Sequence, residues 1–151
     1  MGHGLIVKCK KCKTEIAFNT GIGMAFPSEY KDITDGINKG DYGKEWRAFF
    51  EENPGAAVDA SRSIYQCEAC HELVEEYDLS LYSNKKGNPP EHGVCVPWEL
   101  TEGDYELVKI YEHRCPKCGN VMKKIDEDNV PSLPCPKCGR KLIIVDKIMW
   151  D

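Results

Sequence analysis

The residues in this chain best suited to chemistry are its nine cysteines. Eight of them form Cys-x-x-Cys pairs, namely Cys9 and Cys12, Cys67 and Cys70, Cys115 and Cys118, and Cys135 and Cys138. Two intervening residues form a tight turn from which both thiolates can face a single ion, so the spacing favours metal binding over disulfides. The ninth, Cys95, lies between two valines, and we interpret it as a small buried apolar side chain rather than a reactive thiol or an exchangeable ligand.

The order of the pairs predicts two sites, each with four thiolates and one Zn²⁺. Sixteen residues separate Cys118 from Cys135, a spacing typical of a structural zinc site. Joining Cys12 to Cys67 has to bridge 54 residues, but loop-closure entropy grows only with the logarithm of length and adds about 1 kcal/mol. We therefore predict that the first pair joins the second and the third joins the fourth, because consecutive elements usually lie side by side. The rival arrangement connects pairs across the two halves of the chain.

The pentapeptide "CEACH" at residues 67–71 is also the attachment signature of a c-type haem, in which the histidine is an axial ligand. The other three pairs are followed by Lys13, Gly119 and Gly139 instead. We favour zinc at this position and interpret His71 as a loop residue just after a ligand. The two glycines predict knuckle turns that require a positive φ angle.

Two segments, "CPKCGNVMKK" and "LPCPKCGRKL", resemble the zinc-ribbon (rubredoxin-like) family. The resemblance covers about the last 45 residues and implies a small three-stranded sheet held by one zinc ion through Cys115, Cys118, Cys135 and Cys138. The complete chain is similar to a group of uncharacterised small bacterial proteins with two zinc ribbons, in the loop "GIGMAFP" at 21–27 and in Trp150-Asp151. That likeness implies no activity.

Iron in the same four-thiolate geometry would indicate an electron carrier instead. The rubredoxin-like proteins pack aromatic side chains around their iron, whereas residues 119–134 and 139–149 contain no Phe, Tyr or Trp. We therefore predict two Zn²⁺ ions, with iron as a substitute.

The pairs are flanked by short strand-like segments, which predicts a small metal-bound α+β protein with two ribbons of antiparallel strands. A helical insertion is expected at about 27–54, with Tyr30, Ile33 and Ile37 on one face. The Gly-, Pro- and Asn-rich stretch at 83–93 predicts a boundary. The expected organisation is a first ribbon with its insertion at 1–83, a linker or docking segment at 84–100 and a second ribbon at 101–151.

Composition narrows the range of partners. The formal net charge is −5 at pH 7, so a polyanion would be repelled unless the basic residues were segregated on one face. The lysines and arginines near the cysteine pairs are interpreted first as neutralising the zinc thiolates, with nucleic-acid contact as the alternative. There is no secretory signal or membrane-spanning run, which predicts a cytoplasmic protein.

Four thiolates around zinc leave no open coordination position, and no catalytic triad or Cys-His arrangement is legible in the sequence. We therefore expect a non-enzymatic adaptor or interaction module that presents a rigid surface to a protein partner. The alternatives are a rubredoxin-like electron carrier and a nucleic-acid-binding accessory factor.

Overall fold

The computed structural model describes residues 2–150 and divides them into two compact units. Unit 1 consists of residues 2–23, 62–76 and 112–150, and unit 2 consists of residues 24–61 and 77–111. The chain leaves unit 1 twice to build unit 2. The predicted division into 1–83, 84–100 and 101–151 is therefore not the one that the structure shows, because each unit is assembled from segments that are distant in the sequence.

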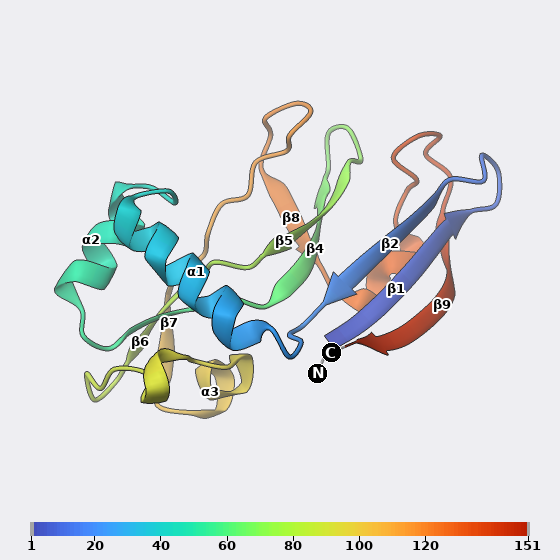
Figure 1. Ribbon diagram of the computed structural model, residues 1–151. Coiled ribbons are helices and arrows are strands. Elements are labelled where there is room, and N and C mark those ends of the chain that lie inside the picture. The colour runs from blue at the N-terminus through green and yellow to red at the C-terminus, as the bar shows by residue number, and fades with distance from the viewer. Residues whose placement is uncertain (1, 151) are drawn as a thin grey trace. The chain divides into compact units, whose positions relative to one another are not determined.

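Unit 1 contains two ribbons of three antiparallel strands. In the first, which we call the outer ribbon, the order is β2 (Glu15–Thr20), β1 (Gly2–Cys9) and β9 (Leu142–Trp150). A hairpin joins β1 to β2, whereas β9 comes from the far end of the sequence and pairs Leu142 with Cys9. Figure 1 shows this pairing of the blue and red strands.

The second ribbon, which we call the inner ribbon, has the same plan. Its strand order is β5 (Leu73–Tyr77), β4 (Arg62–Cys67) and β8 (Met122–Ile125). The hairpin is β4–β5, and β8 pairs with β4 so that Cys67 lies opposite Met122. Each ribbon thus combines one hairpin with a third strand from a later part of the chain.

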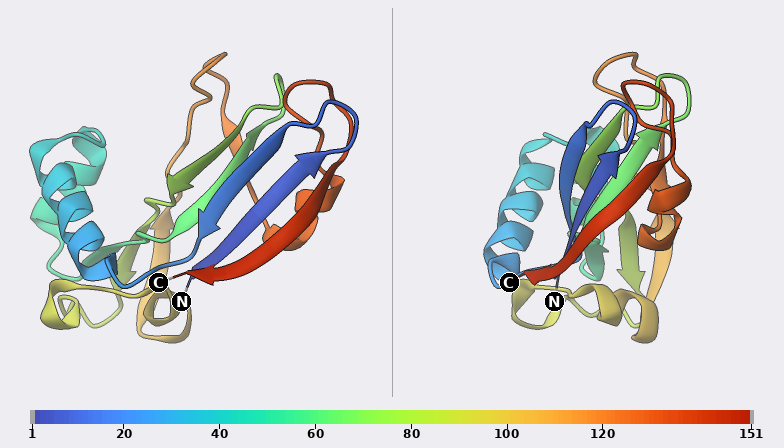
Figure 2. Two further views of the ribbon diagram at one scale, coloured as in Figure 1. Left: turned by 45° about the vertical axis from the view of Figure 1, so that its right-hand side comes forward. Right: turned by 90° about the vertical axis from the view of Figure 1, so that its right-hand side faces the viewer.

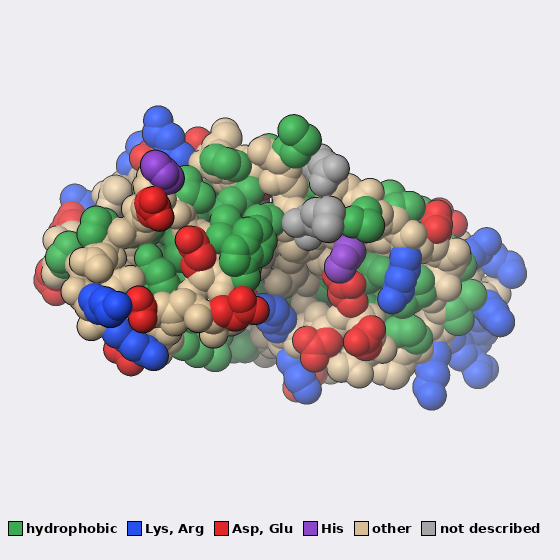
Figure 3. Space-filling model, turned by 90° about the horizontal axis from the view of Figure 1, so that it is seen from below, with side chains coloured by type: hydrophobic (Ala, Val, Ile, Leu, Met, Phe, Trp, Pro, Cys, Tyr) green, Lys and Arg blue, Asp and Glu red, His purple; other side chains and the backbone are tan. Residues whose placement is uncertain are grey.

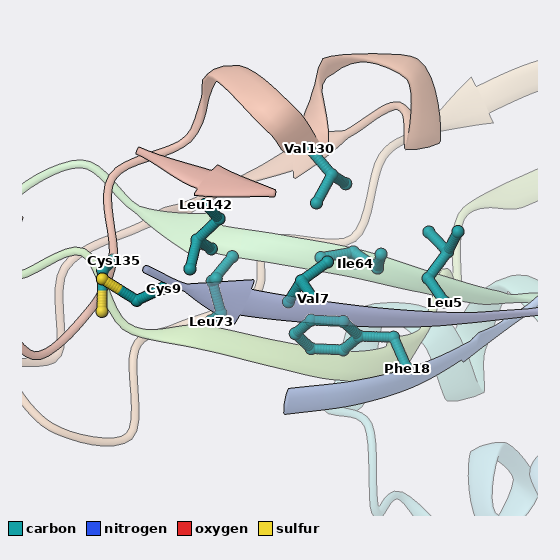
Figure 4. Close-up of a cluster of buried hydrophobic side chains, with 9 residues drawn as sticks. All are labelled: Leu5, Val7, Cys9, Phe18, Ile64, Leu73, Val130, Cys135 and Leu142. Carbon is teal, nitrogen blue, oxygen red and sulfur yellow. The ribbon is translucent and has the colours of Figure 1, made fainter. Parts of the chain in front are cut away.

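The two ribbons of unit 1 share one hydrophobic core, and the views of Figure 2 show their strands face to face. Alternate side chains of β1 enter this core, where they meet Ile64 and Leu73 of the inner ribbon, because successive side chains of a strand point to opposite faces. The short helix η2 (Glu127–Ser132) adds Val130. The cluster drawn in Figure 4 comprises Leu5, Val7, Cys9, Phe18, Ile64, Leu73, Val130, Cys135 and Leu142.

Unit 2 contains the predicted helical insertion, as α1 (Phe26–Lys39) and α2 (Lys44–Glu52). Proline near the start of α1 suits the first helical turn, where no backbone N–H is needed, and Gly40 ends the helix at a φ of 88°. Tyr30, Ile33 and Ile37 are buried, as their helical spacing predicts. Unit 2 also contains a three-stranded sheet of β3 (Ala56–Val58), β6 (Leu81–Asn84) and β7 (Tyr105–Lys109), in the order β3-β6-β7.

The segment expected to be a linker is folded into unit 2. It contains η1 (Glu91–Gly93) and α3 (Pro97–Glu102), with Cys95 and Leu100 buried. Cys95 is 1% exposed, which confirms the interpretation of a buried side chain. Among residues 2–150, no helix is long and apolar enough to cross a bilayer.

Candidate metal centres

All eight paired cysteines come together in two groups of four. The outer tetrad consists of Cys9, Cys12, Cys135 and Cys138, and the inner tetrad consists of Cys67, Cys70, Cys115 and Cys118. Within each tetrad the sulfur atoms all lie within 4.8 Å of one another. Each tetrad takes two cysteines from the turn of a hairpin and two from the turn that precedes the third strand of the same ribbon. In Figure 1 the turns that bring each group together reach the same edge of unit 1.

The sulfur separations fit a tetrahedral metal ion. A Zn–S bond of about 2.3 Å places two sulfur atoms of a tetrahedron about 3.8 Å apart. The Sγ–Sγ distances in the outer tetrad are 3.3 Å for Cys9–Cys138 and 3.7 Å for Cys12–Cys135. The corresponding pairs in the inner tetrad are 3.4 Å and 3.5 Å apart. A disulfide would bring two sulfurs to about 2.05 Å, so these separations exclude disulfides and are compatible with four sulfurs around one metal ion.

The four cysteine turns, or knuckles, share one backbone geometry. In each, the N–H of the first cysteine donates to the carbonyl five residues later, and the N–H four residues later donates back to the first cysteine. In the first knuckle these bonds join Cys9 N to Thr14 O and Lys13 N to Cys9 O, both at 2.9 Å. The equivalent distances in the other three lie between 2.6 and 2.9 Å. The knuckles are therefore equivalent donors of two sulfurs each.

The residue after the second cysteine has a positive φ in all four knuckles. Gly119 and Gly139 take φ angles of 75° and 76°, which confirms the role predicted for them. Lys13 and His71 occupy the same position at 62° and 64°. A side chain in this left-handed region costs roughly 1–2 kcal/mol, because its Cβ crowds the following carbonyl. The histidine of "CEACH" thus stands where a glycine would be less strained.

This geometry accounts for the haem-like motif. Cys67 and Cys70 turn their sulfur atoms toward Cys118 and Cys115, at the distances given above. The backbone N–H of His71 donates to the carbonyl of Cys67 at 2.8 Å and closes the knuckle. The pentapeptide is therefore one half of a cysteine tetrad, and His71 is a turn residue just after it, as interpreted from the sequence.

The burial of the cysteines places each tetrad between the core and the solvent. The first cysteine of every knuckle is at most 3% exposed, whereas Cys12, Cys118 and Cys138 are exposed and Cys70 is intermediate. Two sulfurs of a tetrad thus face apolar side chains and two lie toward water. The outer tetrad contributes its buried sulfurs to the shared core, while the inner tetrad packs on a smaller cluster with Tyr65 and Met122.

Nearby donors favour the thiolate form of one exposed cysteine in each tetrad. The Thr14 hydroxyl, 3.0 Å from Cys12 Sγ, together with the Thr14 backbone N–H, lowers the pKa of Cys12 to about 6. The backbone N–H of Asn120, with the Cys67 thiol close by, lowers the pKa of Cys118 to about 6. Metal binding requires deprotonated sulfur, which these contacts favour at Cys12 and Cys118, whereas the neighbouring thiols of the outer tetrad raise the pKa of Cys138 to about 11. Thr14 and Asn120 were not among the residues predicted to act at the sites, although each lies two residues after the second cysteine of its knuckle.

The predicted pairing of the knuckles is wrong. The first knuckle meets the fourth and the second meets the third, which is the rival arrangement across the two halves of the chain. The physical reason is strand pairing: β1 pairs with β9 and β4 with β8, and each pairing aligns two knuckles. The C-terminal ribbon implied for Cys115, Cys118, Cys135 and Cys138 is therefore not formed.

The crossed arrangement also changes the surroundings of the inner tetrad. Tyr65 lies in the cluster with Cys67 and Cys115, and its ring is 4.2 Å from that of His113. Tyr65 lies outside the C-terminal segments 119–134 and 139–149, so sequential pairing of the knuckles did not place it beside a site. The inner tetrad therefore has an aromatic neighbour, so the absence of aromatic side chains does not exclude iron at this site.

Comparison with known proteins does not extend these findings, since no family model, curated protein or solved structure matches the chain.

Proposed function

We propose that the protein is a non-enzymatic interaction module in which each cysteine tetrad holds one Zn²⁺ ion that stabilises the fold. The observation that carries this proposal is the closure of both tetrads by four thiolates each. A structural zinc site uses four protein ligands, whereas a catalytic site keeps one position open for water or substrate. Neither group of sulfurs includes a histidine or carboxylate among the described residues that would make a mixed catalytic set.

The position of the tetrads supports a structural role. The outer tetrad joins the knuckle of a hairpin to the turn before β9, and the inner tetrad does the same for β8. Each bound ion would therefore fix the third strand of a ribbon to its hairpin. Structural zinc contributes folding free energy directly, because the unfolded chain has no preformed site.

An exposed apolar surface on β9 supports a protein partner. Val145, Ile148 and Met149 are 47%, 51% and 63% exposed. Ile148 and Met149 line a hollow of about 350 Å³ together with His3, Glu127, Asp128 and Lys147. Because β9 is the last strand of its sheet, no strand among residues 2–150 pairs with its outer edge. An uncovered edge with apolar side chains is suited to an added strand from another protein.

Cross-linking from this surface tests the interaction. A photoreactive amino acid at Met149 should give a discrete adduct in cells, and the adduct should be reduced by Ile148→Ser. Met24, which is 82% exposed in unit 2, is the control position and should not give the same adduct. An identical set of adducts from both positions, or none from Met149, would refute a partner site on β9.

An iron-containing electron carrier is the second candidate, and the observation in its favour is Tyr65 beside the inner tetrad. Metal analysis and an absorption spectrum of protein purified without added metal distinguish the two. Two zinc ions per chain and no visible absorption are expected. Iron with a thiolate charge-transfer band and a reversible one-electron couple would overturn the zinc assignment in favour of the carrier.

A further inference from the structure

The two tetrads differ sharply in the charge around them. Knuckle segments 8–14 and 134–140, which hold the outer tetrad, contain six lysines and arginines and no carboxylate. The equivalent segments of the inner tetrad, 66–72 and 114–120, contain two of each sign. Four thiolates and one divalent ion carry a charge of −2 at either site, so six cations exceed what the outer site needs. The inner tetrad would carry the same charge of −2, yet its knuckle segments have no excess of basic over acidic residues.

The contacts of the basic side chains differ in the same way. At the inner tetrad, Lys117 Nζ lies 2.7 Å from a Glu72 carboxylate oxygen, and Arg114 pairs with Glu112. At the outer tetrad, no basic side chain of the two knuckles has a carboxylate within 4.0 Å among residues 2–150. These cations therefore remain available to an anion from solution.

The unpaired cations surround one open hollow. It has a volume of about 680 Å³ and is lined by Lys10 and Lys11 of the first knuckle, by Gly139 and Arg140 of the fourth and by Lys141 just after it. We call this feature the basic hollow. Crossed pairing of the knuckles creates it, because 127 residues lie between Lys11 and Gly139 in the sequence. In Figure 3, Lys and Arg side chains gather at the right-hand edge of the view.

The thiolates of the outer tetrad have other stabilising partners. The backbone N–H of Lys137 donates to Cys135 Sγ at 3.4 Å, and the Thr14 hydroxyl lies 3.0 Å from Cys12 Sγ. Neither contact uses a lysine side chain. Local neutralisation, which the sequence analysis favoured, therefore does not account for the whole cluster.

The acidic net charge of the chain lies mostly outside unit 1. The described residues of unit 1 contain thirteen lysines and arginines and ten carboxylates, whereas unit 2 contains seven and fourteen. The objection that the body would repel a polyanion thus applies mainly to unit 2. The basic residues are therefore segregated in unit 1, which is the condition that nucleic-acid contact requires in a chain of negative net charge.

We propose that the basic hollow binds the phosphate backbone of nucleic acid without reading its sequence. An elongated row of phosphates can meet cations from both knuckles at once, and each neutralised phosphate releases a counterion. Residues 8–14 and 134–141 contain no aromatic side chain on which bases could stack, and apart from Gly139 every residue that lines the hollow is cationic. Recognition there rests on charge, so affinity should vary with salt and little with sequence.

Fluorescence anisotropy with the metal-loaded protein and labelled random-sequence 20-mers, as single strands and as duplex, tests the proposal. Four cations line the hollow, so log affinity for duplex should fall with log salt at a slope of about −3.6, or on the order of a hundredfold from 50 to 200 mM. The triple variant Lys10→Gln, Lys11→Gln, Arg140→Gln leaves one lining cation. The salt dependence should therefore become shallower, with a slope of about −0.9, and binding at low salt should weaken at least tenfold. The double variant Lys10→Arg, Lys11→Arg keeps the charge and should retain both the affinity and the salt dependence of the parent.

A charge-matched control separates the hollow from general attraction. Lys31→Gln, Lys39→Gln, Lys44→Gln removes three exposed cations from unit 2 and should leave affinity within twofold. Equal losses in both variants, or no saturable binding below about 100 µM in low salt, would overturn the proposal. Pyrophosphate binding as tightly as the 20-mers would assign the hollow to small phosphates, and retention only by anionic phospholipid vesicles would assign it to membranes. Metal content and melting of every variant are measured first, and binding is compared among those that match the parent.

Discussion

The crossed pairing of the knuckles can be tested with two double variants that differ in one position. Cys12→Ser with Cys138→Ser removes two ligands from the outer tetrad, whereas Cys12→Ser with Cys70→Ser removes one ligand from each tetrad. Under sequential pairing the assignments would be exchanged. The two arrangements therefore predict opposite metal contents for the same two proteins.

The magnitude follows from the free energy of zinc binding. A structural site contributes about 10–16 kcal/mol of apparent binding free energy, which is comparable to the whole stability of a domain. Loss of one thiolate is expected to empty its tetrad. A second substitution in the same tetrad should then add less than about 1 kcal/mol, whereas one in the other tetrad should add its full effect, because only neighbouring positions are strongly non-additive.

The assay is zinc per chain, measured by elemental analysis and native mass spectrometry. Cys12→Ser with Cys138→Ser should match the content of Cys12→Ser alone, near one ion, and Cys12→Ser with Cys70→Ser should hold none. In cadmium-substituted protein, the Cys12 and Cys138 side-chain protons should couple to the same metal resonance. Coupling of Cys12 and Cys70 to a shared ion would refute the crossed pairing, even if every variant failed to fold.

Four further outcomes are expected. Removal of metal by a strong chelator should unfold both ribbons of unit 1, seen as loss of dispersed amide signals, and unchanged spectra would contradict a structural role. His71→Gly should raise the stability of the metal-loaded protein by about 1 kcal/mol and Gly139→Ala should lower it by a similar amount, because both positions have positive φ. Thermal melting at fixed free zinc measures both effects. Equal effects of the same sign would contradict the assignment of strain to these positions. Burial raises the pKa of Cys95 to about 12, so its thiol stays protonated at neutral pH. Cys95 should therefore resist iodoacetamide in the native protein and react after denaturation. Peptide mapping that shows prompt labelling of the native protein would refute its burial. Ile64→Ala should destabilise the protein by about 2–5 kcal/mol and weaken zinc retention at the outer tetrad, whose cysteines share its core; a loss confined to the inner tetrad would count against a common core.

Local features of the fold were predictable where short-range chemistry determines them. The spacing of Tyr30, Ile33 and Ile37 indicated the first helix, and the glycines after two knuckles indicated positive φ. Apolar and polar residues alternate from Leu73 to Leu81, which predicts one continuous strand, but β5 ends at Tyr77 and β6 begins at Leu81. The ladder breaks at Leu79, which has a φ of 65° and whose carbonyl accepts a hydrogen bond from Trp46 Nε1 at 2.8 Å. That contact joins residues 33 positions apart and leaves no trace in the local pattern.

Knuckle pairing was beyond sequence reasoning because the competing free energies are nearly equal. The crossed arrangement closes loops of 44 and 122 residues instead of 54 and 16. Once the inner tetrad has formed, the effective outer loop is shorter than 122, and the logarithmic dependence leaves a difference of about 1 kcal/mol. Burial of the side chains between the two ribbons exceeds that amount easily, since one fully buried Leu or Val contributes about 1.5–3 kcal/mol. The preference for consecutive neighbours therefore could not identify the partner.

The nested connection has a consequence during synthesis on the ribosome. At about 5–20 residues per second, roughly 6–25 s pass between the appearance of Cys12 and that of Cys138. Cys67 and Cys70 are made much earlier, so the first knuckle meets the wrong partner first, and a metal ion captured then would hold a misligated intermediate. Zinc supplied before refolding should therefore give a slower approach to the native state than zinc supplied afterwards, and equal rates would show that the early exchange of ligands is not limiting.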